Sequence, residues 1–197
     1  MARHASLCLC AMLFLAGTAA SQDAPGAARR APISLQPWMA VAAGPASGRL
    51  ECGRCGISGE WQGHATAVSG GLLIVRRLAV GVERRSWVSW FTDSGDRSEA
   101  VLGTLQLVSK DHPHVRTALR ASLGRERYDI DGSVARTVRM TVGGAGAAIV
   151  LLPQAALSPT VALERWWAGG RVPAAGDYPG GAARGGQTSL VVGLVAH

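Results

Sequence analysis

The sequence contains little lysine, few aromatic residues and, beyond its first 20 positions, no long apolar run. Lys110 is the only lysine among 20 basic residues, so the formal net charge of +7 rests on arginine. The arginines are scattered and form no basic helix or cluster, which argues against nucleic acid as a partner. The missing run of about 18 apolar residues excludes membrane-spanning helices there, but membrane-crossing strands carry a much weaker signal and stay possible.

Cysteine is also scarce, and only Cys52 and Cys55 lie outside the apolar N-terminal segment. Their spacing suits three kinds of site. A redox pair needs a helix N-terminus to stabilise a thiolate, whereas Gly53 and Gly56 beside the cysteines indicate a loop. A zinc site needs two further ligands, and no second pair follows. We therefore favour a local disulfide, formed in an oxidising compartment.

Residues 1–20 have the pattern of a secretory signal peptide. The apolar stretch Leu7–Ala16 is too short to span a bilayer, and small residues precede an expected cleavage between Ala20 and Ser21. Residues 21–31 are small and polar and contain proline and glycine, as flexible leaders do. The alternative to a signal peptide is a buried N-terminal helix.

The remaining residues, 32–197, form one domain with about eight strand-length segments. Val115–Tyr128 alternates apolar and polar residues with a period of two, although it also fits a helical stripe. Its neighbours repeat the two-residue period over roughly 10–16 residues, which is long for soluble strands of about 5–6 residues but suits bilayer-crossing strands. Short turns alternate with longer loops, of which the longest are Gly44–Glu60 and Gly170–Gly186. We therefore predict an all-β fold, an eight-stranded antiparallel up-and-down transmembrane β-barrel.

Three stretches carry a family resemblance: SGGLLIVRRLAVGVERRSWVSWF (69–91), ARTVRMTVGGAGAAIVL (135–151) and the terminal SLVVGLVAH (189–197). With the signal peptide, they resemble the small eight-stranded outer-membrane β-barrel proteins of bacteria. The resemblance implies the outer membrane of a Gram-negative-type bacterium, with outer-membrane lipid and the outer-membrane assembly machinery as partners. Such barrels usually end in an aromatic residue, whereas this sequence ends in His197. We expect a monomer with a structural or surface-interaction role.

The two faces of each strand are expected to differ in environment. An arginine near the bilayer midplane costs about 2–4 kcal/mol, so the apolar face should meet lipid and the polar face the interior. Buried charges need partners, and side chains can fill an eight-stranded barrel. We therefore expect a plugged lumen, together with basic outer loops that contact lipid phosphates or other cell-surface polyanions. The predicted interior ion network comprises Glu83, Arg85, Arg116, Arg120, Glu126, Arg139 and Glu164.

Some residues fit this scheme only at particular places. Arg84 and Arg125 fall on the lipid side, and we expect them near the interface, where arginine can extend toward water. His64 falls on the interior side. The tryptophans near strand ends suit either an interfacial aromatic belt or ordinary core packing. These tryptophans are Trp87, Trp90, Trp166 and Trp167.

Candidate catalytic and metal-binding patterns are weak. Asp111–His114 offers metal ligands, but two histidines around a proline are also typical of a polar turn. Ser69 lies in a sequence like a nucleophile elbow without a paired acid and histidine in a suitable context. Gly144–Gly146 resembles a dinucleotide loop without the βαβ unit that such a loop needs. We expect no enzymatic activity, metal or cofactor. The alternatives are a secreted or periplasmic soluble β-barrel that binds a small apolar ligand, and an exported hydrolase that uses Ser69.

Overall fold

The structure is a computed structural model that describes residues 35–55, 57–74, 77–89, 97–109, 112, 114–130, 136–174 and 179–196. The predicted signal peptide, its cleavage site at Ala20 and Ser21, the leader and Trp90 lie outside the described residues. The described residues all belong to one compact unit, Ile33–His197.

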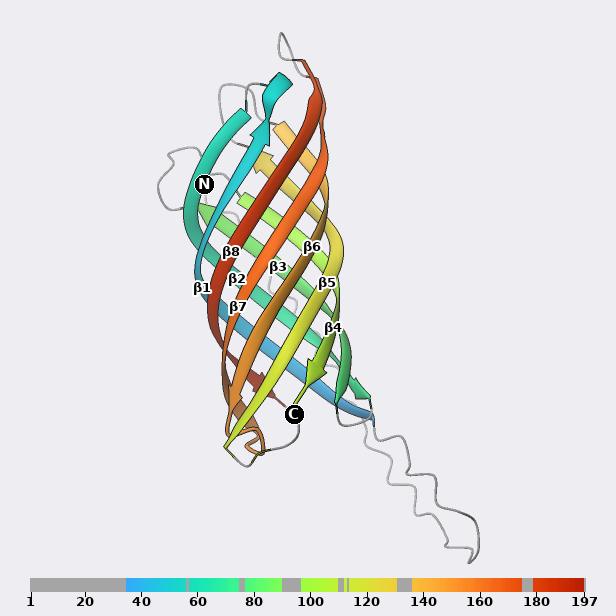
Figure 1. The fold of residues 1–197 in the computed structure, drawn as a ribbon, viewed down its shortest axis with the longest axis vertical. Helices are drawn as coiled ribbons and strands as arrows, with labels where there is room; N and C mark the ends of the chain where they lie inside the picture. The colour runs from blue at the N-terminus through green and yellow to red at the C-terminus, as the bar shows by residue number, and fades with distance from the viewer. Residues whose placement is uncertain are drawn as a thin grey trace, which may run out of the picture. The chain divides into compact units, whose positions relative to one another are not determined.

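Eight strands form a closed barrel in which each strand pairs antiparallel with the next and β8 pairs with β1 (Figure 1). This arrangement confirms the predicted eight-stranded antiparallel up-and-down barrel. Among the described residues, no helix is long and apolar enough to cross a membrane. The elements are β1 Leu35–Cys52, η1 Gly53–Cys55, β2 Ile57–Ile74, β3 Leu78–Ser89, β4 Arg97–Val108, β5 Val115–Ile130, β6 Arg136–Leu151, β7 Leu157–Val172 and β8 Gly181–Ala196.

The stretch that fitted both a helix and a strand is strand β5. It pairs with β6 over its whole length, from Val115 opposite Leu151 to Ile130 opposite Arg136, and with β4 on its other side. A helix here would leave the facing edges of β4 and β6 without hydrogen-bond partners, which a closed barrel avoids. Barrel closure therefore selects the two-residue period.

The prediction of two long loops at Gly44–Glu60 and Gly170–Gly186 is wrong. Most of both stretches is strand, because β1 runs to Cys52 and β8 begins at Gly181. Small residues that read as loop signals instead permit close contact between strands. A Cβ atom on Gly44 would lie 2.0 Å from the carbonyl oxygen of Leu190 on β8. Glycine at this position marks a close backbone approach within the sheet.

The outward face of the barrel changes character along the strands. On β5, Leu119 and Leu123 point outward and are 63% and 67% exposed, whereas Arg125 and Arg127 follow on the same face. All eight strands contribute exposed large apolar side chains to what we call the apolar band. Beyond it, toward the η1 end, lies a ring of exposed arginines, which we call the arginine collar. The collar comprises Arg49, Arg84, Arg97, Arg125, Arg127, Arg139, Arg165, Arg171 and Arg184.

The inward side chains also change in character along the barrel, and two predictions are corrected by this change. At the collar level the inward side chains are mainly apolar, and Val138, Met140 and Val142 of β6 are buried there. Glu126 and Ser98 are the polar neighbours of this apolar packing. Arg139 is therefore outside the barrel, not in an interior ion network. His64 shares the outward side of β2 with the exposed Thr66, so its predicted interior position is also wrong. The sequence rule that apolar residues face lipid holds only within the apolar band.

Two of the tryptophans near strand ends pack inside the barrel, and a third points outward. Trp87 and Trp166 are 1% and 4% exposed, so an interfacial belt is wrong for both and core packing is right. Trp166 covers Gly144 on β6, where an added Cβ would lie 2.2 Å from the indole ring. Trp167 points outward and is 53% exposed. An interior glycine thus provides the space that a large ring needs in a narrow barrel.

Candidate functional site

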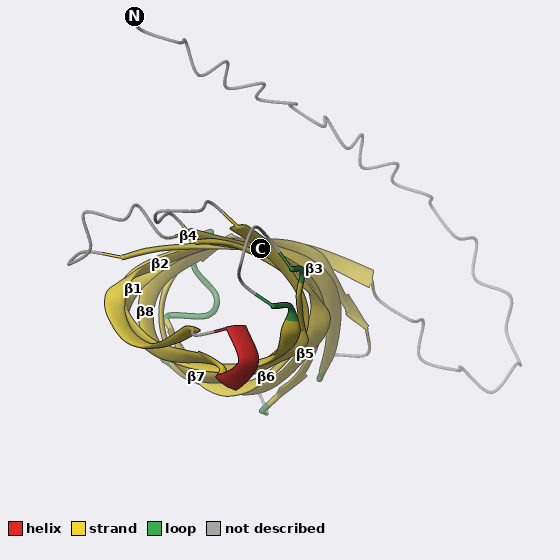
Figure 2. Ribbon diagram, turned by 90° about the horizontal axis from the view of Figure 1, so that it is seen from above, coloured by secondary structure: helices red, strands yellow, loops and turns green. Residues whose placement is uncertain are grey.

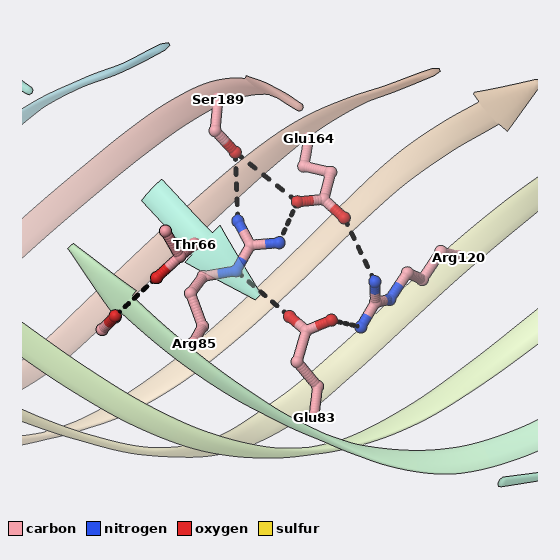
Figure 3. Close-up of polar contacts among 7 residues, drawn as sticks. Thr66, Glu83, Arg85, Arg120, Glu164 and Ser189 are labelled. Atoms are coloured by element: carbon pink, nitrogen blue, oxygen red, sulfur yellow. Dashed lines mark hydrogen bonds and ion pairs between the residues drawn. The ribbon is translucent and has the colours of Figure 1, made fainter. Parts of the chain in front are cut away.

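Four charged side chains meet inside the barrel and form what we call the charged quartet: Glu83, Arg85, Arg120 and Glu164 (Figure 3). Arg85 pairs with Glu83 at 3.1 Å and with Glu164, and Arg120 pairs with Glu164 at 3.3 Å and with Glu83. Every charge therefore contacts two opposite charges. The side chains come from β3, β5 and β7, so the quartet bridges the lumen between separate parts of the wall.

Three of the four quartet side chains are almost fully removed from water, and the Arg120 side chain is 14% exposed. Glu83, Arg85 and Glu164 are between 1% and 4% exposed. Arg85 also donates a hydrogen bond to Ser189 Oγ at 3.0 Å, and its guanidinium carbon lies 4.4 Å from the centroid of the Trp166 ring. Buried charges are tolerated only when they are paired and hydrogen-bonded, and loss of one partner costs about 3–5 kcal/mol. The ring of alternating charges meets that requirement without a net charge.

The other three residues of the expected ion network lie outside the quartet, one of them close to it. Arg116 lines the lumen on the side of the β2–β3 and β4–β5 turns. Glu126 lies within the lumen on the η1 side of the quartet, where it hydrogen-bonds Ser98 and interacts electrostatically with Arg85. Arg139 belongs to the collar. The structure thus joins four of the seven residues in direct ion pairs, at one level of the barrel.

A cavity of about 110 Å³ lies between the quartet and the turn end that carries residues 75–77. Its walls are mainly small apolar residues, including Ala40, Ala79 and Ala148, and the quartet lines it too. Ser69 contributes to the same wall and is 8% exposed. No histidine is among the described residues that line the cavity, so nothing there supports the hydrolase alternative.

The opposite end of the lumen holds an apolar cluster. Figure 2 shows the short helix η1, in red, over the barrel opening in the view from above. Cys52 and Cys55 are joined by a disulfide, are 1% and 2% exposed, and pack in this cluster. Tyr128 and Val172 belong to the same cluster. Within the described residues, no group of three histidine, cysteine or acidic side chains is arranged to hold a metal ion. Asp111 and Pro113 of the DHPH turn lie outside these residues.

The collar places like charges side by side. Arg139 on β6 lies directly opposite Arg127 on β5 and directly opposite Arg171 on β7. Arg127 pairs with Asp129 at 3.1 Å, whereas Arg139 and Arg171 have no ion-pair partner among the described residues. Like charges directly opposite on neighbouring strands are destabilising. Scattered in the sequence, these arginines gave no cluster signal, and only the register brings them together.

The barrel fold is shared with a solved structure. Neisserial surface protein A (NspA) matches 79% of this chain and 95% of its own with a TM-score of 0.58 at 14% identity. The chain has the small eight-stranded barrel fold of that surface protein. Ail, the attachment invasion locus protein of Yersinia pestis, matches with a TM-score of 0.46 at 12% identity in its complex with the heparin analogue sucrose octasulfate, over 81% of this chain and 99% of Ail. No family model matches the sequence, and no curated protein matches it.

Proposed function

We propose that the protein is an integral outer-membrane barrel with a surface-interaction role, in which the arginine collar binds anionic groups at the membrane surface. The apolar band supports the membrane position. From Val115 to Leu123 the outward positions of β5 carry no charge. At about 3.4 Å per residue and a tilt of about 40°, this stretch spans roughly 21 Å, near the apolar height of about 25 Å in membrane barrels. A soluble barrel would expose this band to water.

The row of Arg127, Arg139 and Arg171 is the observation that carries the surface role. Three guanidinium groups lie on adjacent strands and repel one another. A phosphate or sulfate group near Arg139 would relieve that repulsion, since arginine binds such groups through paired hydrogen bonds. The collar therefore favours a polyanionic surface over a neutral partner.

The side chains that fill the lumen favour a barrel that does not conduct ions. The quartet bridges the interior at one level, and Trp87, Trp166 and the apolar cluster fill the level above. An ion would have to leave water, pass the quartet and then cross an apolar layer, which is costly. In planar-bilayer recordings we expect no steady conductance, and a large stable conductance would refute this part of the proposal.

Cell fractionation tests the membrane position. The expressed protein should stay with outer membranes after carbonate or high-salt washing, and its folded form should migrate differently from the boiled form on a gel. Release by either wash would overturn the membrane assignment and would favour the soluble alternative.

Binding to a polyanion tests the collar. The folded protein in neutral detergent should bind dextran sulfate and elute as salt rises, because screening weakens exposed charge interactions. The variant Arg127→Gln/Arg139→Gln/Arg171→Gln should elute at clearly lower salt. The control Arg77→Gln changes an exposed arginine at the opposite end. Elution of both variants with the unsubstituted protein would remove the collar from this role.

A further inference from the structure

We propose that a hollow lined by β7, β8, β1 and β2 binds the phosphorylated saccharide headgroup of a glycolipid in the outer leaflet. This inference rests on the proposed membrane position and names the partner of one part of the collar. The hollow has a volume of about 790 Å³, within the usual range for ligand sites of about 300–1,000 Å³. Gly186 on β8 lines it between the neighbouring strands β7 and β1.

The strand register places the surrounding side chains around Gly186. Trp167 on β7 and Arg49 on β1 lie directly opposite Gly186 on its two sides. One outward position along β8 toward the η1 end is Arg184, and one toward the apolar band is Thr188, whose partner on β7 is Arg165. Gly48 and Gly185 line the hollow with Gly186, so three of its residues have no side chain to fill it.

Packing does not require glycine at position 186. An added Cβ would meet its nearest atoms, the Trp166 carbonyl oxygen and Arg165 Nη2, at 3.5 Å and 3.6 Å, which are ordinary contact distances. The contrast is with Gly44, where a Cβ would overlap the neighbouring backbone. Glycine in a strand weakens the sheet and often marks the place where a ligand approaches. The open surface at Gly186 is therefore assigned to a ligand.

The charges around the hollow are divided between its two sides. On the β1–β2 side, Arg49 pairs with Glu51 at 2.5 Å and with Glu60 at 3.8 Å. On the β7–β8 side, Arg165 donates a hydrogen bond to Thr188 at 2.6 Å, and Arg184 has no ion-pair partner among the described residues. A phosphate fits beside Arg165 and Arg184, because guanidinium groups bind phosphate through two parallel hydrogen bonds.

The acidic side selects the rest of the headgroup. Glu51 and Glu60 accept hydrogen bonds from sugar hydroxyl groups but repel a second dense run of negative charge. The exposed ring of Trp167 offers an apolar face on which the C–H groups of a sugar ring pack. A saccharide with few phosphates therefore fits better than a heavily sulfated polymer.

The apolar band fixes the position of the lipid chains. Leu163 on β7 and Leu190 on β8 are the next outward residues below Arg165 and Thr188, and they are 58% and 46% exposed. Tryptophan and arginine at the border of an apolar band suit the headgroup level of a bilayer. Acyl chains can pack on the leucines while the headgroup occupies the hollow, so the ligand is a glycolipid and not a soluble sugar phosphate.

Native mass spectrometry of the folded full chain in neutral detergent tests this site, with bisphosphorylated lipid A as the probe. We expect one glycolipid to bind tightly, and the dephosphorylated lipid, phosphatidylglycerol and a soluble heparin oligosaccharide to bind at least tenfold more weakly. The double variant Arg165→Gln/Arg184→Gln should lose at least tenfold in affinity. Gly186→Leu should lose a similar amount by filling the hollow, whereas Gly186→Ala should keep the affinity within about threefold.

The control variant Arg84→Gln/Arg97→Gln removes the same charge from β3 and β4 and should bind lipid A as the unsubstituted chain does. Equal losses in both double variants would mean diffuse attraction to the collar and would overturn the site, as would preferential binding of the heparin oligosaccharide. Absence of lipid A binding by a protein that fractionates with membranes and binds dextran sulfate would refute the hollow alone. Release from membranes on washing would instead refute the proposed function.

Discussion

Arg85 lies against the face of Trp166, with 4.4 Å between the guanidinium carbon and the ring centroid. The contact joins the charged quartet to the apolar packing above it. An arginine over an indole face gains a cation–π attraction that strengthens when the pair is removed from water. The pair of Arg85 and Trp166 thus forms the boundary between the charged part and the aromatic part of the lumen.

We predict that Glu83→Gln lowers the free energy of unfolding by about 3–5 kcal/mol, because Arg85 and Arg120 would lose a buried counter-charge. Urea unfolding of the barrel in lipid vesicles, followed by tryptophan fluorescence, measures this loss. Glu99→Gln is the matched control, since its pair with Arg84 is exposed and such pairs contribute about 0–1 kcal/mol. Similar losses in the two variants would contradict the buried quartet.

We predict that Gly144→Ala destabilises the barrel by about 1–3 kcal/mol, since its Cβ would lie 2.2 Å from the Trp166 ring. The control is Gly169→Ala on β7, where no atom lies within 4 Å of an added Cβ. The same unfolding measurement applies. An unchanged midpoint for Gly144→Ala would show that Trp166 does not fill this space.

We predict that Val82→Arg costs about 2–4 kcal/mol in a bilayer, whereas Ser86→Arg on the same face of β3 has a small effect. Val82 is 66% exposed within the apolar band, and Ser86 lies opposite Glu99 near the collar. Folding yield into vesicles and unfolding free energy both report the difference. Equal tolerance of the two substitutions would be incompatible with a band that faces lipid.

We predict that the double variant Cys52→Ala/Cys55→Ala loses about 2 kcal/mol, the loop-closure contribution of a short disulfide loop. Because both sulfurs are buried under η1, a thiol reagent should label the reduced protein slowly until the cap opens. Mass spectrometry after timed alkylation measures that rate. Immediate labelling of the folded, reduced protein would show that the cap does not pack as described.

The barrel itself was predictable because period-two alternation repeats from one segment to the next, and closure resolved the ambiguity of Val115–Tyr128. A contact between Glu83 and Arg120 could also be predicted from the sequence, since the alternation placed both side chains inward. Their particular pairing could not, because it depends on register between β3, β4 and β5. No local sequence signal specifies register across a barrel.

The failures have one main physical source. A single rule, apolar toward lipid, was applied to whole strands, although the barrel extends beyond its apolar band. Arg139 was therefore predicted inside the barrel, whereas the structure places it outside and buries its neighbour Val138. A signal was present in β5, where Leu123 and Arg125 share one outward face. The Gly44–Glu60 stretch failed differently, because glycine that permits close strand packing resembles glycine in a loop.

The abrupt border between apolar and charged outward residues sets how deep the barrel can sit. In a bilayer thicker than the band, acyl chains would meet Arg84 and Arg125, and the membrane would have to thin around the protein. In a thinner bilayer, outward leucines would meet water at the turn end. Each ångström of such mismatch costs a fraction of a kcal/mol. The border therefore fixes the vertical position of the barrel and matches it to membranes of one thickness.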